Sequence, residues 1–210
     1  MIAIIDYGAG NILSVQKALD HIGCGNVVTS DAAVISAADG VVLPGVGAFG
    51  DAMSHLRARG LEGAVKEFAA GGRPFLGICL GLQVLFDHSE ESPEAKGLSL
   101  LPGRVKRFPS DRGLKIPQIG WNSIEYDRAC PLFKGLPEHP YVYFVHSYYL
   151  EAADESIVSA VAEYGIRYHA AVAKDNVFAT QFHPEKSGSI GERILENFLS
   201  MAQTRQTLHP

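Results

Sequence analysis

Two short segments far apart in the chain carry side chains suited to thiol-based acyl transfer. Cys79 lies at the centre of Gly-Ile-Cys-Leu-Gly, residues 77–81, and His183 is followed by Pro184 and Glu185. A thiol nucleophile, an imidazole base and a carboxylate that orients the imidazole are the three groups that this chemistry requires. An α/β-hydrolase has its acid before the histidine in the chain, so the order found here argues against a cysteine-type member of that class.

The residues around Cys79 predict a sharp turn between a strand and a helix. An apolar run, Pro74–Ile78, precedes the cysteine, and glycines flank it on both sides. At the start of a helix the dipole favours a thiolate and lowers the cysteine pKa. The free N–H of Leu80 could then face an oxyanion. On these five residues alone, a buried structural cysteine is an equally good interpretation.

Composition and charge exclude several other functions. The 210 residues are 47% hydrophobic and 20% charged, as expected for one folded domain spanning residues 1–210. A net charge of −5 leaves no basic surplus for nucleic acid. No apolar run is long enough for a membrane span, and the first residues do not resemble a signal peptide. Cys24, Cys79 and Cys130 share no metal-ligand spacing, so we expect no metal, no cofactor and a cytoplasmic protein.

The patterning along the chain predicts an α/β fold. Apolar β-type runs alternate with helical patterns up to residue 88, which is typical of a mainly parallel sheet with helices on both faces. Residues 89–97 are polar and predict a solvated loop. Short β-type runs then follow one another, which predicts a smaller antiparallel β extension or an added sheet in the C-terminal half. The expected architecture is therefore a flavodoxin-like three-layer domain. The strands are expected at 1–6, 27–29, 40–43, 74–78, 104–108, 116–126, 141–150, 157–164, 168–173 and 177–182, and the helices at 12–22, on either side of Gly60, at 80–88 and at 189–201.

Several segments together resemble one family, the class I (triad-type) glutamine amidotransferases. Three further segments are similar to the glutaminase subunits of imidazole glycerol phosphate synthases, which serve histidine biosynthesis. Ala9 and Leu82 stand where such proteins often have methionine, and neither touches a catalytic group. The family segments are Pro44–Gly47, Gly77–Gln83 and His183–Lys186, and the narrower ones are Asp6–Asn11, Gly120–Asn122 and Phe144–Tyr148.

The resemblance implies roles for individual residues. Cys79 would attack the side-chain amide of glutamine, His183 would move the proton to ammonia, and Glu185 would orient His183. Water would then hydrolyse the glutamyl thioester. The oxyanion hole would use the N–H groups of Leu80 and Val46, and the residues holding glutamine would be Gly45, Gly47, Gln83, Ser147 and Tyr148.

The resemblance also implies a partner. Such glutaminases form a heterodimer with a (β/α)₈ cyclase subunit, which receives the ammonia and makes imidazole glycerol phosphate and AICAR. A lyase activity thus belongs to the complex, and glutaminase activity depends on the partner. The alternative is a glutaminase subunit that serves anthranilate, pyridoxal phosphate or guanylate synthesis. The residues that match the interface or its gate are Asn11, Trp121, Tyr143 and Lys186.

Overall fold

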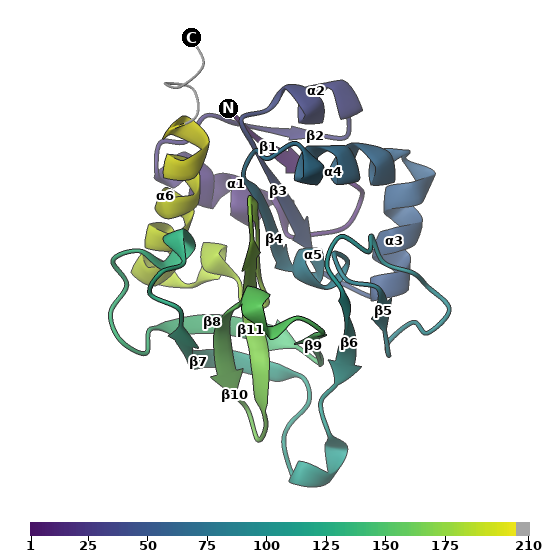
Figure 1. The fold of residues 1–210 in the computed structure, drawn as a ribbon, viewed down its shortest axis with the longest axis vertical. Helices are drawn as coiled ribbons and strands as arrows, with labels where there is room; N and C mark the ends of the chain where they lie inside the picture. The colour runs from purple at the N-terminus through teal and green to yellow at the C-terminus, as the bar shows by residue number, and fades with distance from the viewer. Residues whose placement is uncertain (205–210) are drawn as a thin grey trace.

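A computed structural model describes residues 1–204, and residues 205–210 lie outside the described part. The chain forms a central sheet with helices on both faces, which confirms the predicted α/β class (Figure 1). Within residues 1–204 no helix has both the length and the apolar character needed to cross a membrane. The strands are β1 (Ile2–Ile5), β2 (Asn26–Thr29), β3 (Gly40–Gly45), β4 (Phe75–Cys79), β5 (His88–Ser89), β6 (Gly103–Arg107), β7 (Gln118–Tyr126), β8 (Tyr141–His146), β9 (Tyr148–Ala152), β10 (Val158–Glu163), β11 (Arg167–Lys174) and β12 (Val177–Thr180). The α-helices are α1 (Ile12–His21), α2 (Ala32–Ala37), α3 (Phe49–Ala58), α4 (Leu61–Ala70), α5 (Leu80–Gln83) and α6 (Gly188–Thr204), and the short 3₁₀ turns are η1 (Ser110–Arg112), η2 (Pro131–Phe133), η3 (Glu155–Ile157) and η4 (Pro184–Lys186).

The sheet has a parallel half and an antiparallel half. Its main path runs β2-β1-β3-β4-β12-β11-β10-β7-β8. Pairing is parallel from β2 to β12 and antiparallel from β12 to β8. Strands β9, β6 and β5 branch from β11. The antiparallel strands therefore extend the same sheet, which decides between the two arrangements that the sequence left open.

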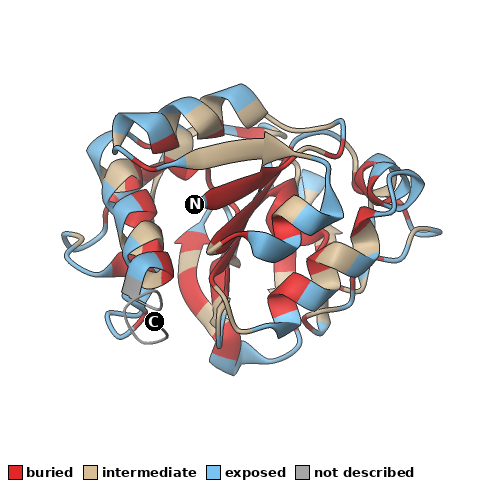
Figure 2. Cartoon of the chain, turned by 90° about the horizontal axis from the view of Figure 1, so that it is seen from above, coloured by how far each residue is buried: buried red, intermediate tan, exposed pale blue. Residues whose placement is uncertain are grey.

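Two hydrophobic cores lie on opposite faces of the parallel half. Along β1, Ala3 and Ile5 belong to the core under α2, α3 and α4, whereas Ile2 and Ile4 belong to the core under α1 and α6. All four side chains are at most 1% exposed. Successive side chains of a strand point to opposite faces, so an unbroken apolar run indicates a strand covered on both sides. Figure 2 shows these buried strands between helices whose outer residues are exposed.

The ends of three neighbouring parallel strands position the candidate site. Strand β4 lies between β3 and β12, with Gly45 paired to Cys79 and Thr180 paired to Ile78. Parallel strands present their carboxyl ends at one edge, where open α/β sheets bind ligands. The loops after β3, β4 and β12 therefore meet, although more than 100 residues separate Cys79 from His183 in the chain.

The predicted helix at residues 80–88 is wrong beyond Gln83. Helix α5 has only four residues. The carbonyls of Val84 and Leu85, which a longer helix would use, instead accept hydrogen bonds from the N–H groups of Leu98 and Leu100 at 2.7 and 2.9 Å. The segment that contains Leu98 and Leu100 thus binds the carbonyl groups that a longer helix would need. This contact is non-local, so the helical pattern of the segment could not reveal it.

The segment 89–97 is anchored, which corrects the predicted solvated loop. Ser92 is buried, and its hydroxyl accepts a hydrogen bond from the N–H of Gly50 at 3.1 Å. The carboxylate of Glu91 accepts another from the N–H of Phe49 at 2.8 Å. Both donors lie in the first turn of α3, whose own N-cap residue supplies no side-chain bond. The loop caps this helix, because free N–H groups at a helix start require acceptors.

The predicted strand at residues 141–150 is divided in two. Strand β8 pairs with β7, whereas β9 pairs with β6 and β11. Ser147 lies between them, and its carbonyl accepts a hydrogen bond from the N–H of Phe108 at 3.1 Å. The change of partner bends the chain between Val145 and Tyr148. This bend brings backbone groups to the pocket described below. The final helix, α6, continues beyond the predicted end at Met201.

Candidate active site

Cys79 occupies a strained turn between β4 and α5. Its φ of 55° and ψ of −105° are uncommon for a residue with a side chain. Such a conformation costs on the order of 1–3 kcal/mol and requires support from the surroundings. The flanking glycines provide it by allowing close approach. A Cβ atom at Gly81 would lie 1.9 Å from the Leu43 carbonyl oxygen, and one at Gly77 would lie 2.7 Å from the Gly81 oxygen.

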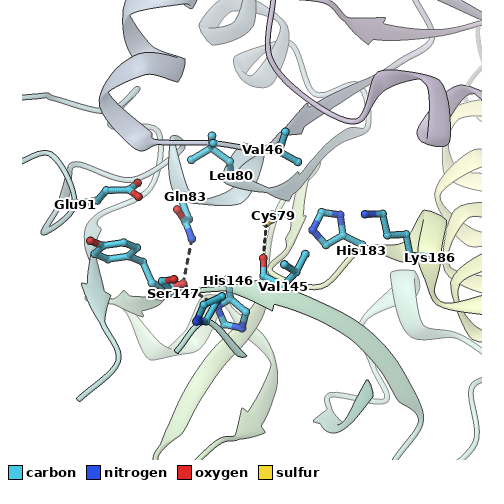
Figure 3. A pocket seen from close by; sticks show the side chains of 13 residues that line it. Val46, Cys79, Leu80, Gln83, Glu91, Val145, His146, Ser147, His183 and Lys186 are labelled. Atoms are coloured by element: carbon cyan, nitrogen blue, oxygen red, sulfur yellow. Dashed lines mark hydrogen bonds between the residues drawn. The ribbon is translucent and has the colours of Figure 1, made fainter. Parts of the chain in front are cut away.

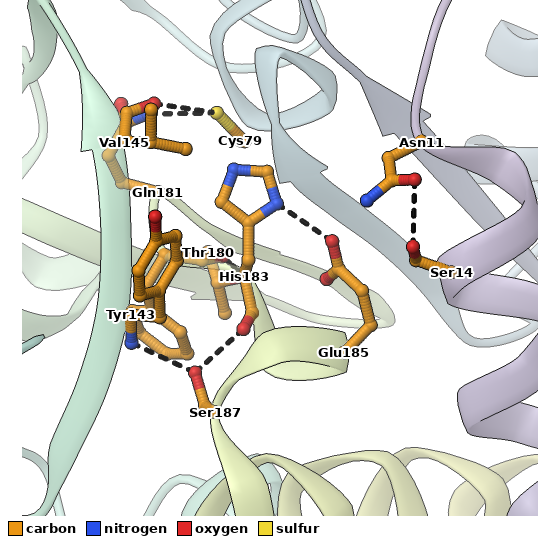
Figure 4. Close-up of polar contacts among 11 residues, drawn as sticks. Asn11, Ser14, Cys79, Tyr143, Val145, Thr180, Gln181, His183, Glu185 and Ser187 are labelled. Atoms are coloured by element: carbon orange, nitrogen blue, oxygen red, sulfur yellow. Dashed lines mark hydrogen bonds and ion pairs between the residues drawn. The ribbon is translucent and has the colours of Figure 1, made fainter. Parts of the chain in front are cut away.

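The thiol of Cys79 is buried and has an unpredicted neighbour. Gln181 is fully buried, and its Nε2 donates a hydrogen bond to the Cys79 sulfur at 3.6 Å. The Val145 carbonyl oxygen lies 4.0 Å from the same sulfur (Figure 4). With only four residues, α5 has a small dipole, so side-chain donors matter more than the sequence indicated. The strand expected at 177–182 includes Gln181, two residues before His183, and this spacing is the signal that could have revealed it.

His183 and Glu185 form a buried pair. His183 Nδ1 lies 2.8 Å from the Glu185 carboxylate, and both side chains are 1% exposed. The other ring nitrogen, Nε2, is buried, has no hydrogen-bond partner in the described part of the chain, and is turned toward Cys79 (Figure 4). Burial lowers the pKa of His183, but Cys79 and Glu185 outweigh it and raise this pKa well above its ordinary value. The arrangement therefore favours the charged form of the His183 imidazole.

Backbone and hydroxyl contacts hold His183 in place. The N–H of His183 donates to the Tyr143 carbonyl at 2.9 Å. The Ser187 hydroxyl donates to the His183 carbonyl at 2.6 Å and accepts from the N–H of Tyr143 at 3.0 Å. These contacts tie the loop after β12 to β8 (Figure 4). The position of the imidazole therefore depends on an antiparallel strand as well as on its own turn.

A pocket of about 440 Å³ opens above the thiol (Figure 3). It brings together most of the residues that the sequence predicted, although Gly45 and Glu185 are not among the lining residues. Glu91 is a further lining residue that the sequence did not indicate. Within residues 1–204 we find no group of three or more His, Cys, Asp or Glu side chains placed to hold a metal ion. The lining residues are Val46, Gly47, Cys79, Leu80, Gln83, Glu91, Pro117, Val145, His146, Ser147, Tyr148, His183 and Lys186.

Gln83 is oriented by two acceptors. Its Nε2 donates to the Tyr148 carbonyl at 3.1 Å and to Gln181 Oε1 at 3.1 Å. These two bonds use both N–H donors of the Gln83 amide. The carbonyl oxygen of Gln83 is the group that can accept a hydrogen bond from a bound molecule. Gln181 thus links the Cys79 sulfur, to which it donates, with the Gln83 amide nitrogen, from which it accepts.

His146 forms a buried polar network beside the pocket. Its Nδ1 lies 2.8 Å from the Tyr148 carbonyl oxygen and its Nε2 lies 3.1 Å from Gln118 Oε1. The Tyr168 hydroxyl donates to the same Gln118 oxygen at 2.9 Å. Burial, opposed by the bond to Tyr148 and assisted by repulsion from His183, lowers the pKa of His146 to about 4. This lowered pKa favours the neutral form of His146, whereas the raised pKa of His183 favours the charged form.

Three of the four residues predicted at an interface or gate lie together. The Trp121 and Tyr143 rings contact each other edge to face with centroids 6.1 Å apart, and Trp121 is 55% exposed. The Lys186 ammonium lies 5.8 Å from the Tyr143 ring centre. Asn11 is separate, on the far side of Glu185, where its Oδ1 accepts from the Ser14 hydroxyl at 2.8 Å (Figure 4). The structure groups Trp121, Tyr143 and Lys186 but not Asn11.

The fold and the site define a class of enzyme. The family model described as glutamine amidotransferase class-I matches residues 3–202. A solved structure of a glutamine amidotransferase has a TM-score of 0.76 at 20% identity and covers 97% of this chain and 100% of its own. PurLQS from Thermotoga maritima has a TM-score of 0.72 at 19% identity, with 95% and 97% covered. These likenesses show the flavodoxin-like fold, and the family match makes the chain a class I glutamine amidotransferase.

More similar relatives narrow the assignment. The chain is 53% identical over 206 residues to imidazole glycerol phosphate synthase subunit HisH of Syntrophotalea carbinolica, covering 96% of this chain and 100% of the relative. It is 52% identical over 197 residues to the same subunit of Moorella thermoacetica, covering 94% and 93%. The chain therefore belongs to the HisH group, the glutaminase subunits of imidazole glycerol phosphate synthase. Amidotransferases of the anthranilate, pyridoxal phosphate and guanylate routes are not favoured.

Proposed function

We propose that residues 1–210 form one domain that hydrolyses L-glutamine through a Cys79 thioester. The observation that carries this proposal is the buried His183–Glu185 pair, whose free Nε2 faces a thiol on the pocket floor. The sulfur forms a bond to the side-chain carbonyl carbon of glutamine. His183 then delivers its proton to the departing ammonia. Water, deprotonated by His183, next attacks the thioester, and glutamate leaves with the thiol restored.

The negative charge on the substrate oxygen requires two donors. Leu80 N–H lies at the first position of α5, where helical N–H groups lack intrahelical acceptors. The second donor is the N–H of Val46, in the peptide that follows Gly45. Gly45 pairs with Cys79 in the sheet, which keeps this peptide beside the nucleophile. Removing one oxyanion donor typically slows such reactions by about 100-fold to 1000-fold.

The other end of the pocket is suited to the amino-acid end of glutamine. The Gln83 carbonyl oxygen and the Glu91 carboxylate can both accept hydrogen bonds from an α-ammonium group. Gly47 has a φ of 103° and offers backbone without a side chain. The backbone at Ser147 and Tyr148 completes this end of the pocket. Figure 3 supports the assignment, because Glu91 and His183 lie on opposite sides of Cys79 and Gln83.

We infer that the ammonia passes to a (β/α)₈ cyclase subunit bound as a heterodimer. The exposed apolar side chains Ile119, Trp121 and Tyr141 on β7 and β8 support a docking surface beside the pocket. Lys186 links this surface to the pocket that it lines. The cyclase would use the ammonia to make imidazole glycerol phosphate and AICAR. We assign the complex to the cytoplasm, where a thiol nucleophile stays reduced.

The test compares Cys79→Ala with Cys130→Ala. Both cysteines are buried and free, but Cys130 does not line the pocket. We expect Cys79→Ala to abolish glutamine hydrolysis while the variant still co-purifies with the cyclase subunit, and Cys130→Ala to retain hydrolysis. Wild-type hydrolysis should rise strongly when the cyclase and its aminoimidazole phosphate substrate are added. Glutamine-dependent turnover by Cys79→Ala would show that the nucleophile is misassigned.

A further inference from the structure

Tyr7 is a core residue whose hydroxyl group is not used by the fold. It follows β1 and is fully buried in the core beneath α3 and α4. Its hydroxyl oxygen is buried and has no hydrogen-bond partner among residues 1–204. Burial, and then the charge of Cys79, raise the pKa of Tyr7, so the hydroxyl remains a donor. Buried polar groups without a partner are rare and require an explanation.

The hydroxyl of Tyr7 lies against Gly45. A Cβ atom at Gly45 would lie 2.6 Å from the Tyr7 oxygen, 2.8 Å from Leu80 Cβ and 2.9 Å from the Gly81 nitrogen. Only a hydrogen atom fits on that side of the Gly45 Cα. The two peptide groups of Gly45 are each one bond from this Cα, so both lie near the hydroxyl. Tyr7 therefore lies beside the residue whose following peptide we assigned as an oxyanion donor.

When this peptide contributes its N–H to the oxyanion hole, the Gly45 carbonyl needs a hydrogen-bond donor. In a trans peptide the carbonyl and the N–H point in opposite directions. When the N–H of Val46 points at the oxyanion beside Cys79, the Gly45 carbonyl points away from Cys79. Gly45 is buried, and a buried carbonyl without a donor is unfavourable. Within the described chain, the heavy atom closest to a Cβ placed on Gly45, its chain neighbours aside, is the unpartnered hydroxyl oxygen of Tyr7.

We propose that Tyr7 is a positioning residue that donates a hydrogen bond to the Gly45 carbonyl when the N–H of Val46 points into the oxyanion hole. This inference rests on the proposed function of the Gly45–Val46 peptide. The bond is absent in the present structure, so it stabilises one orientation of the peptide and not the other. A hydrogen bond made in one state alone shifts such an equilibrium by about 5-fold to 100-fold.

The substitution Tyr7→Phe tests the proposal, because it removes the hydroxyl and keeps the ring. Glutamine hydrolysis is measured in the complex with the cyclase subunit and its substrate. We expect kcat to fall by about 5-fold to 100-fold and KM for glutamine to change less than about twofold. The thermal unfolding midpoint of the chain alone should stay the same or rise, since phenylalanine buries no unpaired hydroxyl.

Tyr168→Phe is the matched control for stability. Tyr168 is also buried, but its hydroxyl donates to Gln118 at 2.9 Å. Its removal should therefore lower the unfolding midpoint, in contrast to Tyr7→Phe. Opposite changes of the unfolding midpoint in Tyr7→Phe and Tyr168→Phe would show that the Tyr7 hydroxyl does not stabilise the fold, whereas the Tyr168 hydroxyl does.

Two reagents for Cys79 provide a second measurement. The γ-aldehyde analogue of glutamine adds the Cys79 sulfur to its carbonyl carbon, and the aldehyde oxygen becomes the oxyanion. Its affinity should weaken in Tyr7→Phe by the same factor as kcat. Alkylation by iodoacetamide, in which sulfur displaces iodide without forming an oxyanion, should keep its wild-type rate.

The outcomes separate the two proposals. If Tyr7→Phe retains the wild-type kcat while Cys79→Ala is inactive, the role of Tyr7 is overturned and the proposed function stands. If Tyr7→Phe lowers kcat together with the unfolding midpoint and the alkylation rate, Tyr7 is merely structural and the inference is again overturned. If Cys79→Ala remains active, the proposed function itself fails.

Discussion

Mild acid should destabilise the folded chain through His146. The imidazole is buried between the Tyr148 carbonyl and Gln118, and the charge of His183 repels a second proton nearby. Its pKa falls from 6.5 to about 4 on folding. Between these two values the unfolded chain binds a proton that the folded chain does not. The contribution of His146 therefore makes the folded state progressively less stable as pH falls through this window.

The magnitude follows from the two pKa values. Each unit of difference corresponds to about 1.4 kcal/mol, so the full effect of His146 is roughly 3 kcal/mol below pH 4. Integrating the proton binding from about pH 7.5 to about pH 5 gives a loss of about 2 kcal/mol. For a typical domain this is a large part of the total free energy of unfolding.

The assay compares wild type with His146→Asn by urea unfolding at both pH values. The asparagine amide can still donate to the Tyr148 carbonyl but does not titrate. Any constant cost of the substitution cancels in the difference between the two pH values. His183 has a raised pKa, so its contribution has the opposite sign: it is full below 6.5 and is lost as pH rises. That contribution is common to both proteins. We expect wild type to lose about 2 kcal/mol more than the variant, and equal losses would refute the reasoning.

Two further substitutions probe the proposed nucleophile, Cys79, and its turn. Gln181→Leu removes the donor to the sulfur, and a hydrogen bond is worth about 0.5–1.5 kcal/mol, so kcat in the complex should fall roughly 2-fold to 10-fold. An unchanged kcat would show that this contact is incidental. Gly81→Ala places a Cβ atom against the Leu43 carbonyl and should lower the free energy of unfolding by about 1–3 kcal/mol in urea. Gly63→Ala on α4 is the control, because an added Cβ atom there meets no atom of residues 1–204 within 4 Å, the helix's own nearby backbone aside, and it should stabilise by about 0.5–1 kcal/mol. Similar losses in both variants would contradict the packing argument.

Much of the parallel half could be predicted from the sequence because its signals are local. A continuous apolar run such as Ile2–Ile5 indicates a strand covered on both faces, and the periodicity of α1 and α6 indicates amphipathic helices. The segments around Cys79 and His183 are also local. They could be assigned to strand ends without knowing the path of the chain between them.

The predictions that were wrong concern segments whose backbone groups bind residues distant in the chain. Helix α5 ends early because Leu98 and Leu100 take the carbonyls that would extend it. The polar loop before them is anchored because Glu91 and Ser92 cap α3. Neither contact changes the pattern of apolar and polar residues in the segment concerned. Hydrogen-bond partners from elsewhere in the chain do not lie at a fixed sequence spacing that such a pattern could reveal.

By itself the sequence determined which chemical groups are available and in what order: a thiol between two glycines, and an imidazole two residues before a carboxylate. Only the tertiary structure decided what surrounds them. Gln181 on the sulfur and the Tyr7 hydroxyl against Gly45 arise where β1, β3, β4 and β12 end at one edge of the sheet. The physical reason is that reactivity depends on burial and on donors a few ångströms away. Those neighbours are set by strand order and register, which local patterns do not encode.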